Sequence, residues 1–391
     1  MAGTRLRTMR RTLITTAALL AGLTALTACG SSSNSSASAK GLPDQIKLVA
    51  INPMTGPAAF AGLAANKGYE LAIKEINDSD LLGGSKLKLE EVDTKGEAQE
   101  AASKLTTAIS DKSIPAVFGS VLSQDALAMS PIAQKSQMPI MYTQAGSDGV
   151  VIGDYTWRAT PLMGTYYSVI KKFIADNGYK STGIIYTSVS PTLTDVATKT
   201  IPELGMKITK TIATSATTQD FAAPVQQILA TKPDVVTVLL QGAANPSTMT
   251  ALRQAGYTGK VLGNSAASAG NLDPAGAAGV GMVWPVDFNY EQKAASSQKF
   301  VAAYKAAYGE DPLNYAAEAY DAAYFVARAI AAADSTDRAA VKDAMVAESK
   351  KSFDGALGEG LTWKDGTIVL DGVVVEHTAD GEKLLYEGSG Q

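Results

Sequence analysis

Cysteine and histidine are almost absent from this sequence, which holds one of each among 391 residues, Cys29 and His377. A disulfide within the chain is therefore impossible, and a zinc site would lack the several Cys or His ligands that it needs. His377 lies in the run 373–378, which has the pattern of an edge strand near the end of the chain. We interpret it as an exposed strand residue and expect neither a metal nor a cofactor.

Charged residues are also few, at 18% of the chain, and 38 acidic residues outnumber 34 basic ones. Residues 1–28 contain four arginines and no acid, so the rest of the chain holds 30 basic and 38 acidic residues, a net charge of −8. No basic stripe interleaved with aromatic residues is present. This balance excludes nucleic acid as a partner, whereas a hydrophobic content of 46% indicates a globular protein.

Sequence motifs of catalysis are missing as well. The chain contains no Gly-x-x-x-x-Gly-Lys-Ser/Thr loop, no His-Glu-x-x-His and no Gly-x-Ser-x-Gly. A Ser-His-Asp triad would depend on His377 in a terminal strand. The Ser-x-x-Lys spacing of Ser296 and Lys299 lies in a helical segment rich in Lys, Gln and Ala, which is typical of a solvated face. We therefore expect a protein that is not an enzyme, with a hydrolase as a remote alternative.

The first 28 residues have the pattern of a signal peptide. Arginines at 5–11 precede an apolar stretch at 13–28 that is too short for a comfortable membrane span. The stretch ends in Leu-Thr-Ala-Cys-Gly at 26–30, which resembles the lipobox of bacterial lipoproteins. The resemblance implies cleavage before Cys29 and two or three lipid chains on it, enough for stable anchoring. The alternative is an ordinary secretory signal with a chance cysteine. Residues 29–43 would be the lipidated cysteine and a flexible Ser-rich tether spanning roughly 20 Å.

Beyond the tether, short apolar runs alternate with segments of helical length. We expect strands at 46–51, 87–92, 115–119, 139–142, 183–186, 206–212, 234–240 and 261–263, and helices at 62–77, 97–111, 123–135, 165–177, 193–204, 221–230, 246–255, 294–308, 315–332 and 337–347. The end, 361–385, has short strands and turns. This alternation predicts α/β architecture, with parallel sheets covered by helices on both faces. Two such domains suggest a cleft between them, where ligands bind beyond the carboxyl ends of the strands.

Several short motifs occur in the order and spacing of a known family. They include Met54-Thr55-Gly56-Pro57-Ala58, Gly68-Tyr69-Glu70-Leu71-Ala72-Ile73, Gly119-Ser120-Val121-Leu122-Ser123, Trp157-Arg158-Ala159-Thr160-Pro161, Leu252-Arg253-Gln254-Ala255-Gly256 and Ala319-Tyr320-Asp321-Ala322. Together they resemble substrate-binding proteins of ABC transporters of the branched-chain amino acid (Leu/Ile/Val) type, which have the periplasmic binding protein fold, type I. The match covers nearly all of 45–391.

The resemblance implies two Rossmann-like lobes with parallel sheets, joined by a three-crossover hinge that closes around a ligand. Each lobe would be interrupted in the sequence. The implied ranges are 44–161 plus 286–357 for lobe 1 and 162–285 plus 358–391 for lobe 2. The crossovers would lie near Pro161, Pro285 and Gly358.

In lobe 1, the resemblance implies two small-residue loops that hold the ligand's carboxylate. Ser123 matches the first loop and stands at an expected helix N-terminus, where a hydroxyl and free backbone N–H groups favour an anion. Ala145, Gly146 and Ser147 match the second loop, with the Ser147 hydroxyl as a donor and the Ala145 carbonyl as an acceptor for an amine. The alternative is helix capping by Ser123 and a simple turn at Gly146.

Lobe 2 departs from the pattern of an amino-acid binder, which needs an acid and tyrosines around the ligand's ammonium group because a desolvated cation requires paired acceptors. Ser265 stands where the acid would fall. Pro191 and either Ala244 or Asn245 stand where the tyrosines would fall. Asp195 could supply an acid from the next turn, although a solvated helix-start carboxylate is an alternative role. Pocket walls are expected from Phe60, Tyr142 and Tyr186, for which core packing is an equally good interpretation.

These features together predict a monomeric extracytoplasmic lipoprotein on the outer face of the cytoplasmic membrane. It would capture a small polar solute, such as an amino acid, a small carboxylate or an amide, and deliver it to an ABC permease and ATPase complex. A ligand-sensing receptor lipoprotein of the same fold is the alternative, and the sequence does not separate the two.

Overall fold

The structure, a computed structural model, describes residues 41–215, 217–268 and 270–388. The expected signal peptide, Cys29 and nearly all of the tether therefore lie outside the described residues. Within the described ranges, none of the helices combines the length and the apolar character that a membrane crossing requires.

The first sheet has eight strands in the order β11-β12-β13-β5-β4-β3-β1-β2. Its strands are β1 (Gln45–Asn52), β2 (Lys86–Asp93), β3 (Val117–Gly119), β4 (Ile140–Tyr142), β5 (Thr156–Arg158), β11 (Phe353–Gly355), β12 (Gly358–Lys364) and β13 (Thr367–Val369). The strands β1 to β5 pair in parallel, and β12 is antiparallel to both of its neighbours. We call this sheet and its helices lobe 1.

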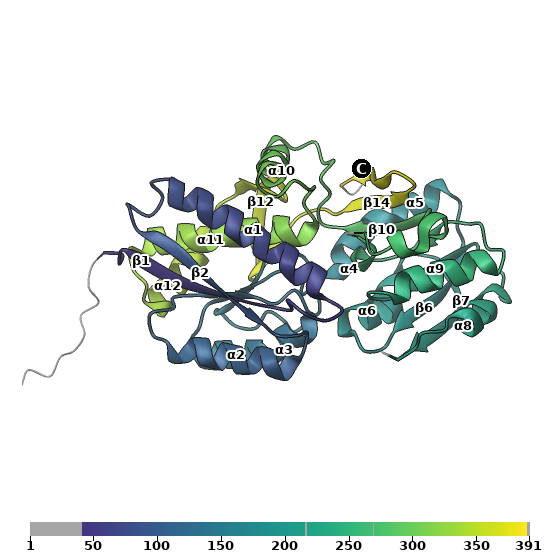
Figure 1. Cartoon of the computed structure of the whole chain (residues 1–391), viewed down its shortest axis with the longest axis horizontal. Coiled ribbons are helices and arrows are strands. Elements are labelled where there is room, and N and C mark those ends of the chain that lie inside the picture. The colour runs from purple at the N-terminus through teal and green to yellow at the C-terminus, as the bar shows by residue number, and fades with distance from the viewer. Residues whose placement is uncertain (1–40, 216, 269, 389–391) are drawn as a thin grey trace, which may run out of the picture. The chain divides into compact units, whose positions relative to one another are not determined.

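Helices cover both faces of the first sheet, because successive side chains of a buried strand point to opposite faces. Leu48 of β1 joins the core beneath α1 (Ala59–Asp78) and α11 (Asn314–Ala333), whereas its neighbour Val49 joins the core beneath the other helix layer. The remaining helices of lobe 1 are α2 (Ala98–Ser110), α3 (Ser123–Lys135), α10 (Ala295–Tyr308) and α12 (Arg338–Glu348). Figure 1 shows α1 and α11 on one side of the sheet and α2 and α3 on the other.

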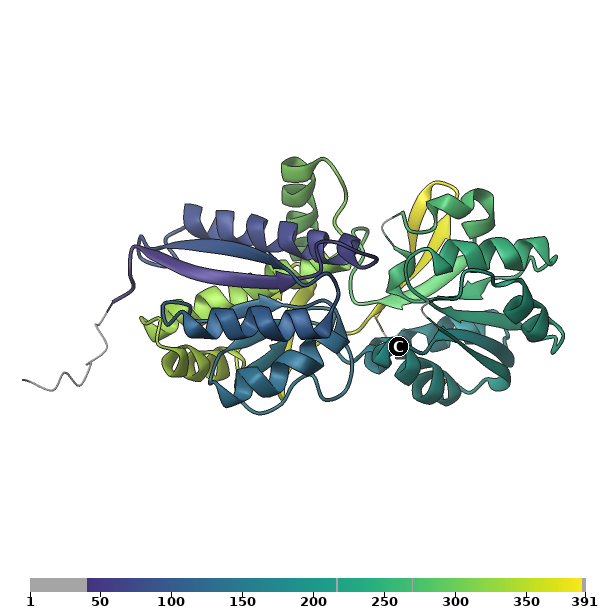
Figure 2. The same cartoon turned by 60° about the horizontal axis from the view of Figure 1, so that its bottom comes forward.

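The second sheet has seven strands in the order β15-β14-β10-β9-β8-β6-β7. They are β6 (Ser181–Thr187), β7 (Lys207–Thr214), β8 (Val235–Leu239), β9 (Val261–Leu262), β10 (Met282–Val286), β14 (Val373–Thr378) and β15 (Gly381–Glu387). One face is covered by α4 (Met163–Tyr166), α5 (Ile170–Asp176), α6 (Pro191–Asp195) and α7 (Ile201–Glu203), and the other by α8 (Ala222–Leu229) and α9 (Ala244–Gln254). We call this sheet and its helices lobe 2; the second view separates the two sheets (Figure 2). The predicted α/β architecture with two mainly parallel sheets is confirmed.

The third crossover differs from the expectation. The boundary expected near Gly358 is wrong, since β12 and β13 pair with β11 and β5 and therefore belong to lobe 1. Trp363 and Ile368 are buried in the lobe 1 core, and Val373 is the first residue of this segment in a lobe 2 core. The chain thus changes lobes between β13 and β14. An apolar pattern of short strands predicts burial but does not tell which sheet they join.

The connections between the lobes run close together at Gly372. A Cβ atom at this position would lie 2.5 Å from the Cβ of Tyr166 and 3.0 Å from the carbonyl oxygen of Val286. Glycine is therefore required here because a side chain would collide with two other connecting segments.

Candidate functional site

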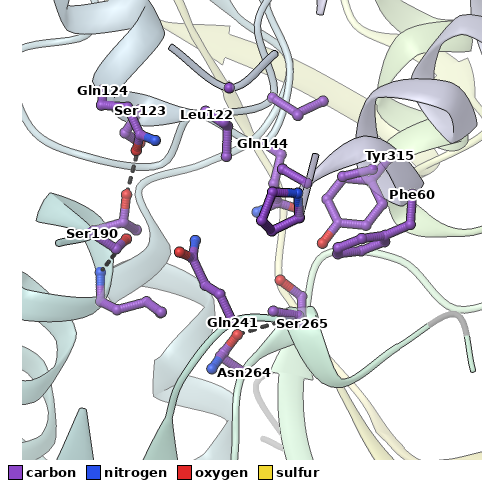
Figure 3. A pocket seen from close by; sticks show the side chains of 18 of the residues that line it. Phe60, Leu122, Ser123, Gln124, Gln144, Ser190, Gln241, Asn264, Ser265 and Tyr315 are labelled. Carbon is purple, nitrogen blue, oxygen red and sulfur yellow. Dashed lines mark hydrogen bonds between the residues drawn. The ribbon is translucent and has the colours of Figure 1, made fainter. Parts of the chain in front are cut away.

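Both lobes line one pocket, which encloses about 960 Å³ of empty space, its open mouth included. From lobe 1 it is lined by Pro57, Ala58, Phe60, Ala61, Lys95, Gly96, Val121, Leu122, Ser123, Gln124, Gln144 and Tyr315, and from lobe 2 by Met163, Ser190, Thr192, Leu193, Gln241, Asn264, Ser265 and Ala266. Figure 3 shows these side chains converging from both sides.

The position of the pocket follows from the sheet topology. Apart from Tyr315 in α11 and Met163 in α4, its residues lie in the segments that follow β1, β2, β3 and β4 in lobe 1 and in those that follow β6, β8 and β9 in lobe 2. The carboxyl ends of parallel strands meet at one edge of a sheet, so these segments gather there. The pocket is therefore the place where the carboxyl edges of both sheets face each other.

Among the lining residues the only charged side chain is that of Lys95. Its backbone is left-handed (φ 57°), and its N–H donates to Asp93 Oδ1 at 2.8 Å. Asp93 also accepts from the N–H of Met54 at 2.7 Å and from the hydroxyl of Thr55 at 2.6 Å. Burial acts to raise the pKa of Asp93, but these hydrogen bonds prevail and lower it to about 2. An ionised Asp93 therefore ties the loop after β1 to the Lys95 loop.

Amide side chains from both lobes contribute to the remaining polar lining. Asn264 is fixed by two hydrogen bonds, since its Oδ1 accepts from the Ala266 N–H at 2.9 Å and its Nδ2 donates to the Leu240 carbonyl at 3.1 Å. Gln144 donates from Nε2 to the Tyr166 hydroxyl at 3.3 Å and accepts at Oε1 from Asn314. Gln241 extends into the space between the lobes (Figure 3).

An aromatic pair forms the apolar wall. The rings of Phe60 and Tyr315 meet edge to face, with centroids 5.7 Å apart and an interplanar angle of 80°. Burial raises the pKa of Tyr315, whose hydroxyl hydrogen-bonds Ser265 of lobe 2. The pocket thus combines a rigid aromatic wall with hydroxyl and amide groups, which is the usual composition of a site for a small organic ligand.

Three hydroxyl groups connect the lobes beside the pocket. Thr192 Oγ1 of lobe 2 donates to Ser123 Oγ of lobe 1 at 2.7 Å and lies 2.6 Å from Ser147 Oγ. The Ser147 N–H completes the cluster by donating to Ser123 Oγ at 3.3 Å. Thr192 reaches this position because Ser190 caps the N-terminus of α6, accepting from the Leu193 N–H.

Comparison with protein families matches residues 45–382 to one described as periplasmic binding protein. The chain belongs to the periplasmic binding protein family. Leu/Ile/Val-binding protein homolog 7 of Brucella abortus (strain 2308) is 25% identical over 367 residues, which cover 83% of this chain and 90% of that protein. The leucine-binding protein LivK of Thermotoga maritima superposes with a TM-score of 0.79 at 25% identity, covering 88% of this chain and 98% of the other. A solute-binding protein from R. palustris in complex with benzoate has the same TM-score at 21% identity, covering 88% and 96%.

In this periplasmic binding protein, three of the sequence-predicted site residues line the pocket: Phe60, Ser123 and Ser265. The loop Ala145–Ser147 lies behind the pocket, because its neighbour Arg158 holds it there. The Arg158 Nη1 donates to the carbonyls of Ala145 and Ser147, each at 2.9 Å. Burial lowers the pKa of Arg158 to about 10, so the guanidinium stays charged at neutral pH. The Ala145 carbonyl, expected to accept from a ligand's amine, thus faces a buried cation.

The other predicted residues are not among those that line the pocket. Tyr142 points into the core beneath α3, where its hydroxyl accepts from Ser130 at 2.9 Å. Asp195 forms an ion pair of 2.8 Å with Lys199, one turn along the same helical segment. Asn245 is buried beneath the pocket, where its Nδ2 donates to the carbonyls of Leu240 and Ala266. Gly146 packs against Met163, and Tyr186 packs against a lobe 2 core.

Sequence reasoning missed several lining residues of this periplasmic binding protein, above all Lys95, Gln144, Gln241, Asn264 and Tyr315. Lys95, Gln241 and Asn264 shortly follow strands that the sequence pattern had located. Polar residues at the carboxyl ends of parallel strands were the signal that could have found them. Tyr315 opens a helix far along the chain, and no local signal links it to the pocket.

Proposed function

We propose that this chain is the solute-binding protein of an ABC importer, which captures a small solute between its lobes and delivers it to a permease. The observation that carries this proposal is a pocket lined by both lobes at the carboxyl edges of both sheets. Membership of the periplasmic binding protein family supports it. The relatives named as Leu/Ile/Val-binding and leucine-binding proteins support transport of a small organic solute.

For the solute, we infer a small carboxylate or amide without an ammonium group. None of the lining residues is acidic, so the pocket offers no counter-ion to a desolvated cation. The buried Arg158 lies directly behind the loop that would hold an amine, which adds unfavourable positive charge. A carboxylate, by contrast, would find the Lys95 ammonium and the N-terminus of α3, where Ser123 begins the helix. The Phe60–Tyr315 wall suits an apolar or aromatic body.

We further propose that the protein is a lipoprotein anchored through Cys29 on the outer face of the cytoplasmic membrane. The support is the sequence alone, namely the apolar stretch at 13–28 and the Leu-Thr-Ala-Cys-Gly motif. The tether at 29–43 would let the folded body reach the permease and ATPase complex while it remains attached.

The solute class is tested by a binding panel of benzoate, 3,4-dihydroxybenzoate, acetamide, L-leucine and L-isoleucine, measured by thermal shift and calorimetry. A true solute at one hundred times its Kd stabilises the folded protein by about 2.7 kcal/mol. We expect stabilisation by a member without an ammonium group, which the exchange Gln241→Ala weakens and the exchange of exposed Gln226→Ala leaves unchanged. Micromolar binding of L-leucine or L-isoleucine would refute the inferred solute class.

A further inference from the structure

Two carboxyl side chains lie in direct contact behind the pocket, at the passage between the lobes. Asp287 directly follows β10, and Glu318 lies in α11. The two carboxyl groups lie within hydrogen-bonding reach of each other, the Asn314 amide lies within reach of both, and both acidic residues are 0% exposed. No lysine, arginine or histidine of the described ranges forms an ion pair with either of them. A buried acidic pair without a cation requires a proton to be stable.

The pair joins the hinge to the pocket. On the hinge side, the Thr160 hydroxyl in the first crossover donates to Asp287 Oδ2 at 2.6 Å, in the second crossover. On the pocket side, Glu318 accepts from the backbone N–H of Gln144 and from Asn314 Nδ2, the latter at 2.9 Å. Asn314 donates as well to the side-chain oxygen of Gln144.

Gln144 depends on these contacts. Its backbone has φ 37°, a left-handed conformation that residues other than glycine seldom adopt without support from their surroundings. Both its N–H and its side-chain oxygen are held by α11, the helix that carries Glu318. The pose of this pocket residue therefore follows the position of the Glu318 carboxyl.

We propose that Asp287 and Glu318 share one proton, and that this proton-holding pair is the positioning device that fixes Gln144 in the pocket and ties it to the hinge. The shared proton lies between the carboxyl groups of Glu318 and Asp287. Loss of the proton leaves two carboxylates in contact, which repel each other in a buried setting. The contact between the two carboxyl groups then opens. Glu318, which accepts the hydrogen bond from the Gln144 N–H, moves as a result. The proposal rests on the proposed function only in treating Gln144 as a solute-facing residue.

The surroundings of the pair contribute no competing titration in the relevant range. Tyrosines face it from three helices: Tyr69 of α1, Tyr166 of α4 and Tyr315 of α11. Burial raises the pKa of each, so all three remain neutral. Burial and the neighbouring Asp287 raise the pKa of Glu318 well above its usual range. An acid whose pKa is raised by folding stabilises the folded state below its unfolded pKa, and this stability is lost as the pH rises through the folded pKa.

The test uses the full chain without any solute, so its outcome does not depend on whether the proposed solutes bind. We expect the infrared spectrum at neutral pH to show the C=O stretch of one protonated carboxyl, absent in Glu318→Gln. The free energy of unfolding by urea should fall from mildly acidic to alkaline pH in the wild type. The neutral isostere Glu318→Gln should flatten this profile, and the control Glu203→Gln, an exposed residue of α7, should leave it unchanged.

A second measurement separates positioning from mere stability. In the wild type, the backbone amide resonance of Gln144 should shift with the same pH midpoint as the infrared band, and in Glu318→Gln it should not depend on pH. Asp287→Asn, which removes the second carboxyl, should flatten the unfolding profile in the same way, whereas Glu318→Ala should lose stability at every pH. A wild-type protein with no protonated-carboxyl band, or a Gln144 resonance that titrates alike in wild type and Glu318→Gln, would overturn the proposal.

Discussion

The hydroxyl of Thr192 in lobe 2 donates a hydrogen bond of 2.7 Å to the hydroxyl of Ser123 in lobe 1. Both side chains line the pocket and are nearly inaccessible to solvent. The lobes therefore touch through side chains at the very place where the sequence predicted a carboxylate contact. Since Ser123 also accepts from the Ser147 N–H, Thr192 completes a small buried network that exists only while the lobes are together.

The first prediction concerns this contact. Thr192→Val keeps the shape of the side chain and removes the hydroxyl, so the closed arrangement loses about 1 kcal/mol for the hydrogen bond to Ser123. We expect the Kd of the solute to rise roughly three- to tenfold in calorimetry, because closure becomes less favourable. The control is Thr198→Val, whose hydroxyl donates to the Thr194 carbonyl on the exposed side of the same helical segment. Equal affinities of wild type and Thr192→Val would argue against a role in closure.

The second prediction compares two arginines, so that an effect on ligand binding can be distinguished from an effect on the stability of the fold. Arg158 donates to the carbonyls of Ala145 and Ser147, and Arg338 donates to three backbone carbonyls away from the pocket. Arg158→Met and Arg338→Met should each lower the free energy of unfolding in urea by about 2–4 kcal/mol, because buried carbonyls lose their donors.

Only Arg158→Met should change the ligand range of the pocket, since it frees the loop carbonyls and removes the positive charge behind them. We expect weaker binding of carboxylates and a gain in binding of amines, measured by calorimetry on the same panel. The same shift in Arg338→Met would show that the ligand range follows stability rather than charge.

The third prediction concerns the anchor. Cys29→Ala removes the sulfur that would carry the lipid, so the protein should move from the membrane fraction to the soluble extracytoplasmic fraction. The control Ser33→Ala, within the same tether, should remain with the membrane. Immunoblots of the fractions give the measurement, and unchanged membrane association of Cys29→Ala would remove the lipoprotein proposal.

Most of the fold could be predicted from the sequence, because buried parallel strands and amphipathic helices have different periods and alternate along the chain. Within the run at 234–240, for example, β8 (Val235–Leu239) is a fully buried strand, as its valines and leucines indicated. The last crossover could not be placed in this way. Trp363 and Val374 are both buried strand residues, and only the pairing of their strands decides which lobe contains each.

A residue of the site could be predicted from the sequence where its place in the pocket depends on a local feature of the chain. Ser123 follows from the start of a helix after a strand, which is a local feature. Tyr142 does not line the pocket, because a tyrosine at the end of a strand can point to either side of the sheet. Its hydroxyl here accepts a hydrogen bond from the Ser130 hydroxyl in the core. Tyr315 and Gln144 come together only through packing between segments remote in the sequence, which no local pattern records.

The passage of the chain between β13 and β14 has a consequence for biosynthesis. The first sheet is completed by strands at 353–369 and the second by strands at 373–387, so both sheets need strands that follow residue 352. A nascent chain that lacks these strands leaves part of each hydrophobic core uncovered, because Trp363 lies in the lobe 1 core and Val374 in a lobe 2 core.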